Sequence, residues 1–178
     1  MTASIAFDDA LILSHRANPT GSNFRERQAG GNPLGLCPAY RLYENQTYGR
    51  LADRFGSNLY ILSAGWGLIR ADFLTPYYDI TFSPSADSYK RRRKADRYQD
   101  FCMLLRDADE PIVFFGGKDY VPLFCTLTKS AKGKRTIFYN SARPPEAPDC
   151  RLERFETATR TDWHYECANH FLNKENAL

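Results

Sequence analysis

The sequence predicts an α/β fold with a mostly parallel central sheet and helices on both of its faces. Short apolar runs of four to six residues alternate with stretches of helical periodicity, which is typical of such folds. Three of the apolar runs end in polar or glycine-rich loops, and open parallel sheets bind ligands outside the carboxyl ends of their strands. The length of 178 residues fits one domain with a sizeable core, so we expect a single domain over residues 1–178.

Four apolar runs are expected to form strands of the sheet. They are residues 10–14 (ALILS), 59–64 (LYILSA), 111–115 (PIVFF) and 136–139 (TIFY). Short apolar runs bounded by turn signals are consistent with buried strands. The run 59–64 is the clearest, because the glycines of Gly65-Trp66-Gly67 signal a tight turn directly after it. A central sheet of about four to six strands would be of ordinary size.

Helices are expected between these strands. The candidates are residues 38–55, 95–108, a weaker stretch that ends near 130, and the tail from 161, with Thr161 or Asp162 as its N-cap. In 95–108, Tyr98, Phe101, Cys102 and Leu105 share one helical face. Residues 69–84 look irregular, and residues 141–149 (SARPPEAPD) form a proline-rich connector.

Positive charge is concentrated in the middle of the chain. The formal net charge is only +3, yet an unbroken basic run is followed by one more arginine: Lys90, Arg91, Arg92, Arg93, Lys94 and Arg97. Such a run is either a solvated surface or a set of contacts to nucleic-acid phosphates, which depend on local charge density. A second basic cluster consists of Lys129, Lys132, Lys134 and Arg135. Most of the aromatic residues, 14% of the chain, are expected in the core, and the rest are candidates for stacking on a nucleobase.

The cysteines and the first residues favour a cytoplasmic protein. The five cysteines are an odd number without a C-x-x-C pair, which is typical of reduced thiols. The first residues, MTASIAFDDALIL, carry acidic side chains before a very short apolar run, unlike a secretory signal. Because no stretch approaches the roughly twenty apolar residues of a membrane span, we expect no membrane partner.

Three motifs resemble those of the YaaA-like family, which includes peroxide-stress proteins and bacterial and phage relatives. They are residues 38–43 (PAYRLY), 60–69 (YILSAGWGLI) and 76–81 (PYYDIT). Residues 115–120 (FGGKDY) are similar to the family's GK-x-Y segment after a strand. The resemblance covers residues 10–125, with residues 160–178 as a C-terminal helical extension. It departs from the family at Ser14-His15-Arg16-Ala17-Asn18, where members commonly carry a Ser/Cys-Cys/Gly-x-Lys loop.

This resemblance implies an α/β fold with a basic cleft and a nucleic-acid partner in a stress or defence response. It favours DNA over RNA as that partner, and the choice between the two stays open. Similar domains occur beside enzymes that handle modified nucleobases. The resemblance therefore also implies that processing of a base or of its N-glycosidic bond is a candidate activity.

The loops that follow the strands are expected to meet in one pocket. Its expected substrate-binding residues are Ser14, Ser63, Gly65, Trp66, Gly67, Tyr77, Lys118 and Tyr120, and its expected catalytic residues are Asp79, Asp119 and His15. In a glycosidase, Asp79 would be the main carboxylate, Trp66 the stacking platform and Lys118 the phosphate or oxyanion partner. The alternative for both aspartates is a loop carboxylate that accepts bonds from nearby backbone amides.

No cofactor and no metal ion is expected. The Gly116-Gly117-Lys118 string lacks the spacing of a nucleotide-binding P-loop. His164, Cys167 and His170 are one ligand short of the usual structural zinc site, and a nucleophilic Cys37 would need a base nearby. Three classes of function stay open: a nucleic-acid-processing enzyme, a non-catalytic DNA- or RNA-binding protein, and a protein-interaction module.

Overall fold

The structure is a computed structural model that describes residues 4–8, 32, 34–43, 45–93, 95–96, 98–157 and 161–175. The expected strand at 10–14 lies outside the described residues. The same holds for four of the expected site residues, Ser14, His15, Lys94 and Arg97.

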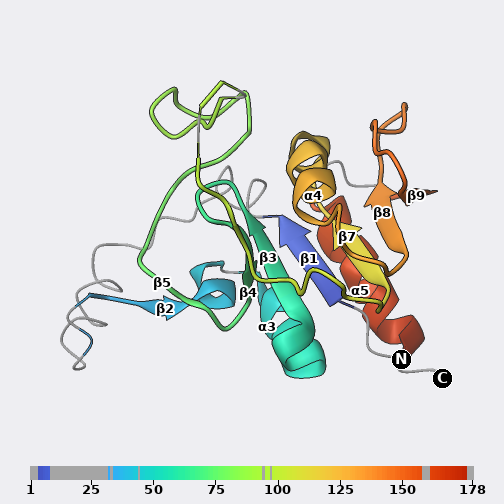
Figure 1. The fold of residues 1–178 in the computed structure, drawn as a ribbon, viewed down its shortest axis with the longest axis horizontal. Coiled ribbons are helices and arrows are strands. Elements are labelled where there is room, and N and C mark those ends of the chain that lie inside the picture. Colours follow the sequence, from blue (N-terminus) through green and yellow to red (C-terminus); the bar gives the residue numbers. More distant parts are fainter. Residues whose placement is uncertain are drawn as a thin grey trace.

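Within the described ranges, seven strands form one mixed sheet in the order β6-β4-β3-β1-β7-β8-β9 (Figure 1). These strands are β1 (Ser4–Asp8), β3 (Leu59–Ser63), β4 (Gly67–Arg70), β6 (Phe101–Cys102), β7 (Ile112–Phe115), β8 (Arg135–Tyr139) and β9 (Arg151–Arg154). Strands β1, β3, β7, β8 and β9 run parallel, whereas β4 is antiparallel to β3, and β6 follows the direction of β4. A separate antiparallel sheet pairs β2 (Cys37–Pro38) with β5 (Leu74–Thr75).

The expected mostly parallel central sheet of four to six strands is therefore wrong. The sheet is mixed, and a small antiparallel sheet lies apart from it. The physical reason is the length of the connection after β3, because Ser63 pairs with Gly67 across a turn of only three residues. Such a short turn joins antiparallel neighbours, since a parallel strand needs a crossover of a dozen or more residues.

Three helices of the described chain cover the two faces of this sheet. They are α3 (Gln46–Phe55), α4 (Val121–Leu127) and α5 (Trp163–Glu175), with single-turn helices η1 (Ala39–Leu42), η2 (Gly56–Asn58) and η3 (Lys118–Tyr120). Helices α3 and α5 share a core with Ile61 and Phe115, and α4 shares another core with Leu62 and Phe114. Two cores arise because successive side chains of a strand point to opposite faces of the sheet. None of the helices in this part of the chain has the length and apolar character that a bilayer span requires.

The expected helix at 95–108 is not formed. Phe101 and Cys102 instead make the edge strand β6, in which Phe101 N donates to Trp66 O at 2.8 Å and Met103 N donates to Leu68 O at 2.8 Å. Pairing with β4 thus overrides the helical spacing of the apolar residues, because tertiary context outweighs local propensity. Strand β9, with the sequence RLER, is a further strand that the apolar pattern does not predict, since it lies at the other sheet edge.

Candidate functional site

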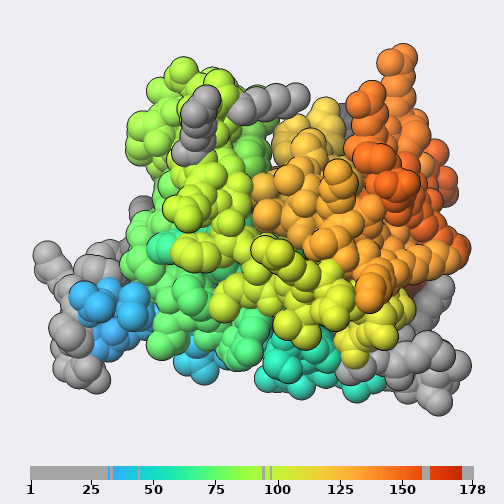
Figure 2. Space-filling model, viewed as in Figure 1, coloured from blue at the N-terminus to red at the C-terminus, as the bar shows by residue number. Residues whose placement is uncertain are grey.

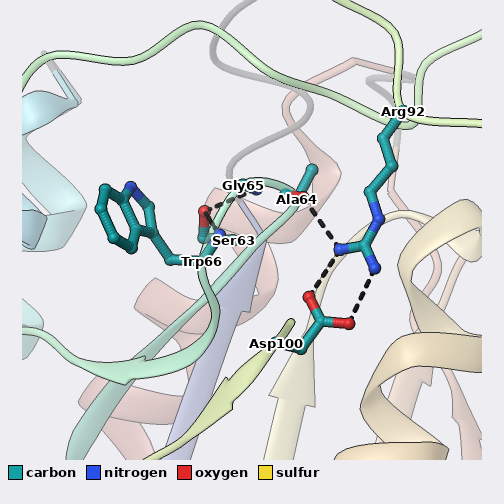
Figure 3. A network of polar contacts seen from close by, with 6 residues as sticks. All are labelled: Ser63, Ala64, Gly65, Trp66, Arg92 and Asp100. Carbon is teal, nitrogen blue, oxygen red and sulfur yellow. Dashed lines mark hydrogen bonds and ion pairs between the residues drawn. The ribbon is translucent and has the colours of Figure 1, made fainter. Parts of the chain in front are cut away.

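The turn after β3 is held by the side chain of Ser63. This side chain is fully buried, and its Oγ accepts hydrogen bonds from Gly65 N and Trp66 N, both at 3.1 Å. Figure 3 shows that the indole of Trp66 points to one side of this turn, while Arg92 approaches from the other side. The turn therefore separates an aromatic side from a charged side at the carboxyl end of β3.

On the aromatic side, the indole of Trp66 is half-buried among other rings. It stacks on Phe101 with centroids 6.1 Å apart and meets the edges of Tyr78 and Phe73 at 6.2 and 6.4 Å. A Cβ atom on Gly65 would lie 3.3 Å from the Tyr78 ring, so glycine permits the close approach of this ring to the turn. Because Phe101 already stacks on Trp66, the expected stacking platform is in part a packing residue.

Residues 78–82 connect the turn after β3 with the turn after β7. Tyr78 contacts Trp66 at one end of this segment. At the other end, the Thr81 hydroxyl lies 3.4 Å from the Tyr120 hydroxyl, and the Phe82 and Tyr120 rings meet edge to face at 4.8 Å. Tyr120 is fully buried, so the structure places this expected substrate-binding residue in the core. Its neighbours Lys118 and Asp119 are exposed on η3.

Asp79 lies in this same segment and forms an ion pair. Its carboxylate is 2.5 Å from Lys90 Nζ, and both side chains are partly buried. The carboxylate raises the pKa of the Lys90 ammonium, which therefore keeps its charge. Burial raises the pKa of the neighbouring Tyr77 hydroxyl, and the negative charge of Asp79 raises it further. Through its ion pair with Lys90, the expected catalytic residue Asp79 thus connects the basic run to residues 77–82.

Arg92, at the centre of the basic run, is buried rather than displayed on the surface. Its guanidinium makes a bidentate ion pair with Asp100, at 2.6 and 2.7 Å, and donates to Ala64 O at 2.9 Å (Figure 3). It also lies over the ring of Tyr98 at 4.2 Å and over that of Phe82 at 5.2 Å. Planar stacking and two parallel hydrogen bonds suit arginine and not lysine. This member of the expected phosphate-binding set is therefore a structural residue.

The remaining described members of the run lie on a loop of residues 83–93. The loop, light green in Figure 1, protrudes beyond the ends of β3 and β4, and Figure 2 shows it as part of a lobe beside α4. The Tyr89 side chain is 80% exposed, with Lys90 Nζ 5.5 Å from its ring. Arg93 is exposed, and Arg91 is half-buried, with a long bond of 3.3 Å to Pro84 O.

The second basic cluster lies at the opposite edge of the sheet. Lys129, Lys132 and Lys134 are exposed between the end of α4 and the amino end of β8. The fourth member, Arg135, is buried. Because the loop 83–93 lies at the carboxyl edge, one short ligand segment would not contact both clusters.

The histidine and cysteine residues of α5 do not form a metal site. His164 and Cys167 are buried while His170 is exposed, and no cluster of three metal-ligating side chains occurs among the residues that the structure describes. Burial lowers the pKa of His164 to about 3 and raises the pKa of Cys167 to about 12, so both stay uncharged. Cys37 is likewise buried.

A polar groove between α3 and α5 was not expected from the sequence. It has a volume of about 500 Å³ and is lined by Asn45, Gln46, Thr47, Arg50, Asp162, Tyr165, Glu166 and Asn169. Arg50 donates to Asn169 Oδ1 at 2.6 Å, and Asn169 donates to Thr47 Oγ1 at 3.1 Å. Polar helix residues of this kind are equally typical of solvated helix faces, so no pattern in the sequence distinguishes them.

Comparison of the chain with models of protein families, with curated proteins and with solved structures yields no match. The likeness to YaaA-like proteins therefore rests on the sequence motifs alone.

Proposed function

We propose that this protein binds nucleic acid through the loop of residues 83–93. The observation that carries the proposal is the side chain of Tyr89, which is 80% exposed beside Lys90 on a lobe that also carries Arg91 and Arg93. An exposed aromatic ring offers a face on which a base can stack, and flanking cations contact the phosphates. This combination suits a single strand, whose bases are accessible.

The loop is fixed to the body of the protein from both of its sides. Asp79 holds Lys90, and Asp100 holds Arg92 through a bidentate ion pair. In addition, the backbone of Thr81 exchanges hydrogen bonds with that of Lys90 and Arg92, at 2.9 and 2.8 Å. A loop that is ordered before binding loses less conformational entropy on association, which supports a role in recognition.

Binding is tested by fluorescence anisotropy with single-stranded and duplex oligonucleotides, each at two salt concentrations. In the Arg91→Gln/Arg93→Gln variant we expect roughly tenfold weaker binding and a salt slope smaller by about two. The matched control is Lys129→Gln/Lys132→Gln, which removes the same charge at the opposite sheet edge. If the two variants lose the same affinity, only net charge matters and the loop is not the site.

The stacking contact is tested by two substitutions of Tyr89. Tyr89→Ala removes the ring and should weaken single-strand binding by about 1–3 kcal/mol, the usual contribution of one stacked base. Tyr89→Phe keeps the ring and should bind like the original protein. Equal losses in both variants would show that the hydroxyl, and not the ring, makes the contact.

Processing of a base is a second candidate function, favoured by the position of Asp79. This partly buried carboxylate lies beside Tyr77, in the segment that contacts Trp66. A glycosidic reaction needs such a carboxylate to stabilise positive charge on the sugar or to activate water. Plain and base-modified oligonucleotides are incubated with the protein, and mass spectrometry detects released base. Release that Asp79→Asn abolishes while binding is retained supports the candidate, and binding without release rejects it.

A further inference from the structure

Two thiols from distant parts of the chain face each other on the α4 side of the sheet. Cys125 lies on α4 and Cys150 directly precedes β9, and their sulfur atoms are 4.0 Å apart. Both side chains are only partly buried, and all five cysteines of the chain are reduced thiols. A disulfide needs a sulfur separation of about 2 Å, so the two sulfur atoms must approach each other further for the bond to form.

The buried guanidinium of Arg135 holds the two cysteine segments together. Its Nη1 donates to Cys125 O at 3.4 Å, and its Nη2 donates to Pro148 O at 3.3 Å and to Asp149 O at 3.5 Å. Arg135 is only 8% exposed. One rigid, planar group thus contacts the backbone of α4 and of the turn that precedes Cys150.

The backbone of this turn fixes the direction from which Cys150 approaches. Asp149 adopts a left-handed conformation with φ 59°, and Cys150 N donates to Ala147 O at 3.3 Å. Left-handed residues are uncommon outside glycine, although aspartate tolerates them better than most. The backbone of the turn, and with it the Cα atom of Cys150, is therefore held in a defined position relative to α4.

We propose that Cys125 and Cys150 form an oxidation site, which closes to an intramolecular disulfide on reaction with a low-molecular-weight disulfide such as oxidised glutathione. One thiolate attacks the glutathione disulfide, which forms a mixed disulfide and releases one reduced glutathione. The second thiolate then attacks the protein sulfur and releases the second reduced glutathione. Two protein thiols are oxidised and one glutathione disulfide is reduced, so the electrons balance.

The environment of Cys125 affects its reactivity. Burial and the neighbouring Cys150 raise the pKa of Cys125 to about 11, which keeps the Cys125 thiol protonated. Because the thiolate is the nucleophile, Cys125 is suited to the second, intramolecular step, where proximity compensates for its low thiolate fraction. Closure joins α4, which follows η3 at the carboxyl edge, to the start of β9. Whether α4 is covalently linked to the start of β9 would then depend on the redox potential of the surroundings.

The test treats the full chain with oxidised glutathione under native conditions and maps its tryptic peptides. We expect peptides 119–129 and 136–151, which hold Cys125 and Cys150, to be linked, with the loss of two of the five thiols. The linked form should have a higher Tm than the reduced form, and dithiothreitol should reverse the change. This proposal does not depend on nucleic-acid binding and fails or succeeds separately.

Three variants control the assignment. Cys125→Ser and Cys150→Ser should abolish the link and the change in Tm. Cys102→Ser removes the exposed cysteine and should retain both. Glutathione that remains on one cysteine without a link, a link that includes Cys102, or five thiols that all survive the treatment would each overturn the proposal.

Discussion

At the scale of single residues, neighbouring members of the basic run lie in opposite environments. Arg92 turns inward to Asp100 and the backbone of Ala64, whereas Arg93 next to it is exposed. Burial of a guanidinium is tolerable only when its charge and its donors are satisfied, and here a carboxylate and a carbonyl do so. A charged residue in a basic run is therefore not by itself a ligand contact.

Removal of Arg92 should destabilise the protein strongly. In Arg92→Ala the carboxylate of Asp100, which is only 15% exposed, loses its ion-pair partner. Breaking a buried pair typically costs about 3–5 kcal/mol of unfolding free energy. Urea unfolding, followed by circular dichroism, measures this loss. The control Arg93→Ala changes an exposed side chain and should stay within about 0.5 kcal/mol of the original protein. Similar values for the two variants would contradict the structural role of Arg92.

At the scale of elements, the pairing of β6 with the β3–β4 hairpin depends on the close approach of the Phe101 backbone to Gly67. Gly67 has φ +88°, and a Cβ atom there would lie 2.8 Å from Phe101 N and would overlap Phe101 O. This glycine is thus needed both for the backbone conformation and for the pairing of β4 with β6. The edge strand in turn places Phe101 on Trp66.

Gly67→Ala should therefore destabilise the protein by at least about 2 kcal/mol, because a strained φ and a backbone overlap add together. The matched control is Gly49→Ala in α3, where a Cβ atom would meet nothing within 4 Å. Alanine in a helix interior should stabilise by about 0.5–1 kcal/mol. Thermal unfolding measures both changes. A neutral Gly67→Ala variant would mean that β6 does not pair with β4 as described.

At the scale of the whole molecule, a buried histidine makes the stability depend on pH. His164 is fully buried on α5, with its ring 3.9 Å from that of Tyr165. Burial lowers its pKa from 6.5 to about 3 in the folded protein. The unfolded chain therefore binds a proton below about pH 6.5 that the folded protein does not bind until about pH 3.

Folding stability should fall as the pH decreases from about 6.5 toward 3, by up to about 1.4 kcal/mol per pH unit from this group. His164→Leu removes the group and should flatten this part of the stability profile, although it also changes packing. The slope, and not the absolute stability, is thus the relevant readout, and urea unfolding at several pH values measures it. His170→Gln, an exposed control on the same helix, should keep the slope. An unchanged slope in His164→Leu would rule out this histidine as the cause.

Some elements of the fold could be predicted from local pattern. The strands expected at 59–64, 111–115 and 136–139 correspond to β3, β7 and β8, and the helix expected from 161 corresponds to α5. The three strand predictions are confirmed because these runs are short and apolar, with glycine or proline at or near their ends. The helix prediction is confirmed because Thr161 and Asp162 offer an N-cap just before the helical stretch.

The sequence by itself determined where β3, β7 and β8 lie and that a tight turn follows β3, because these features depend on neighbours in the chain. Only the tertiary structure decided that the sheet is mixed, that residues 101–102 form a strand and that Arg92 is buried. Likewise, only the tertiary structure decided that Cys125 lies next to Cys150. Each of these features depends on partners far apart in sequence, such as Arg92 with Ala64 or Phe101 with Trp66. The local spacing of apolar residues carries no information about such distant partners. The hydrogen bonds and packing with these partners therefore decide the structure, even where the local spacing favours another element.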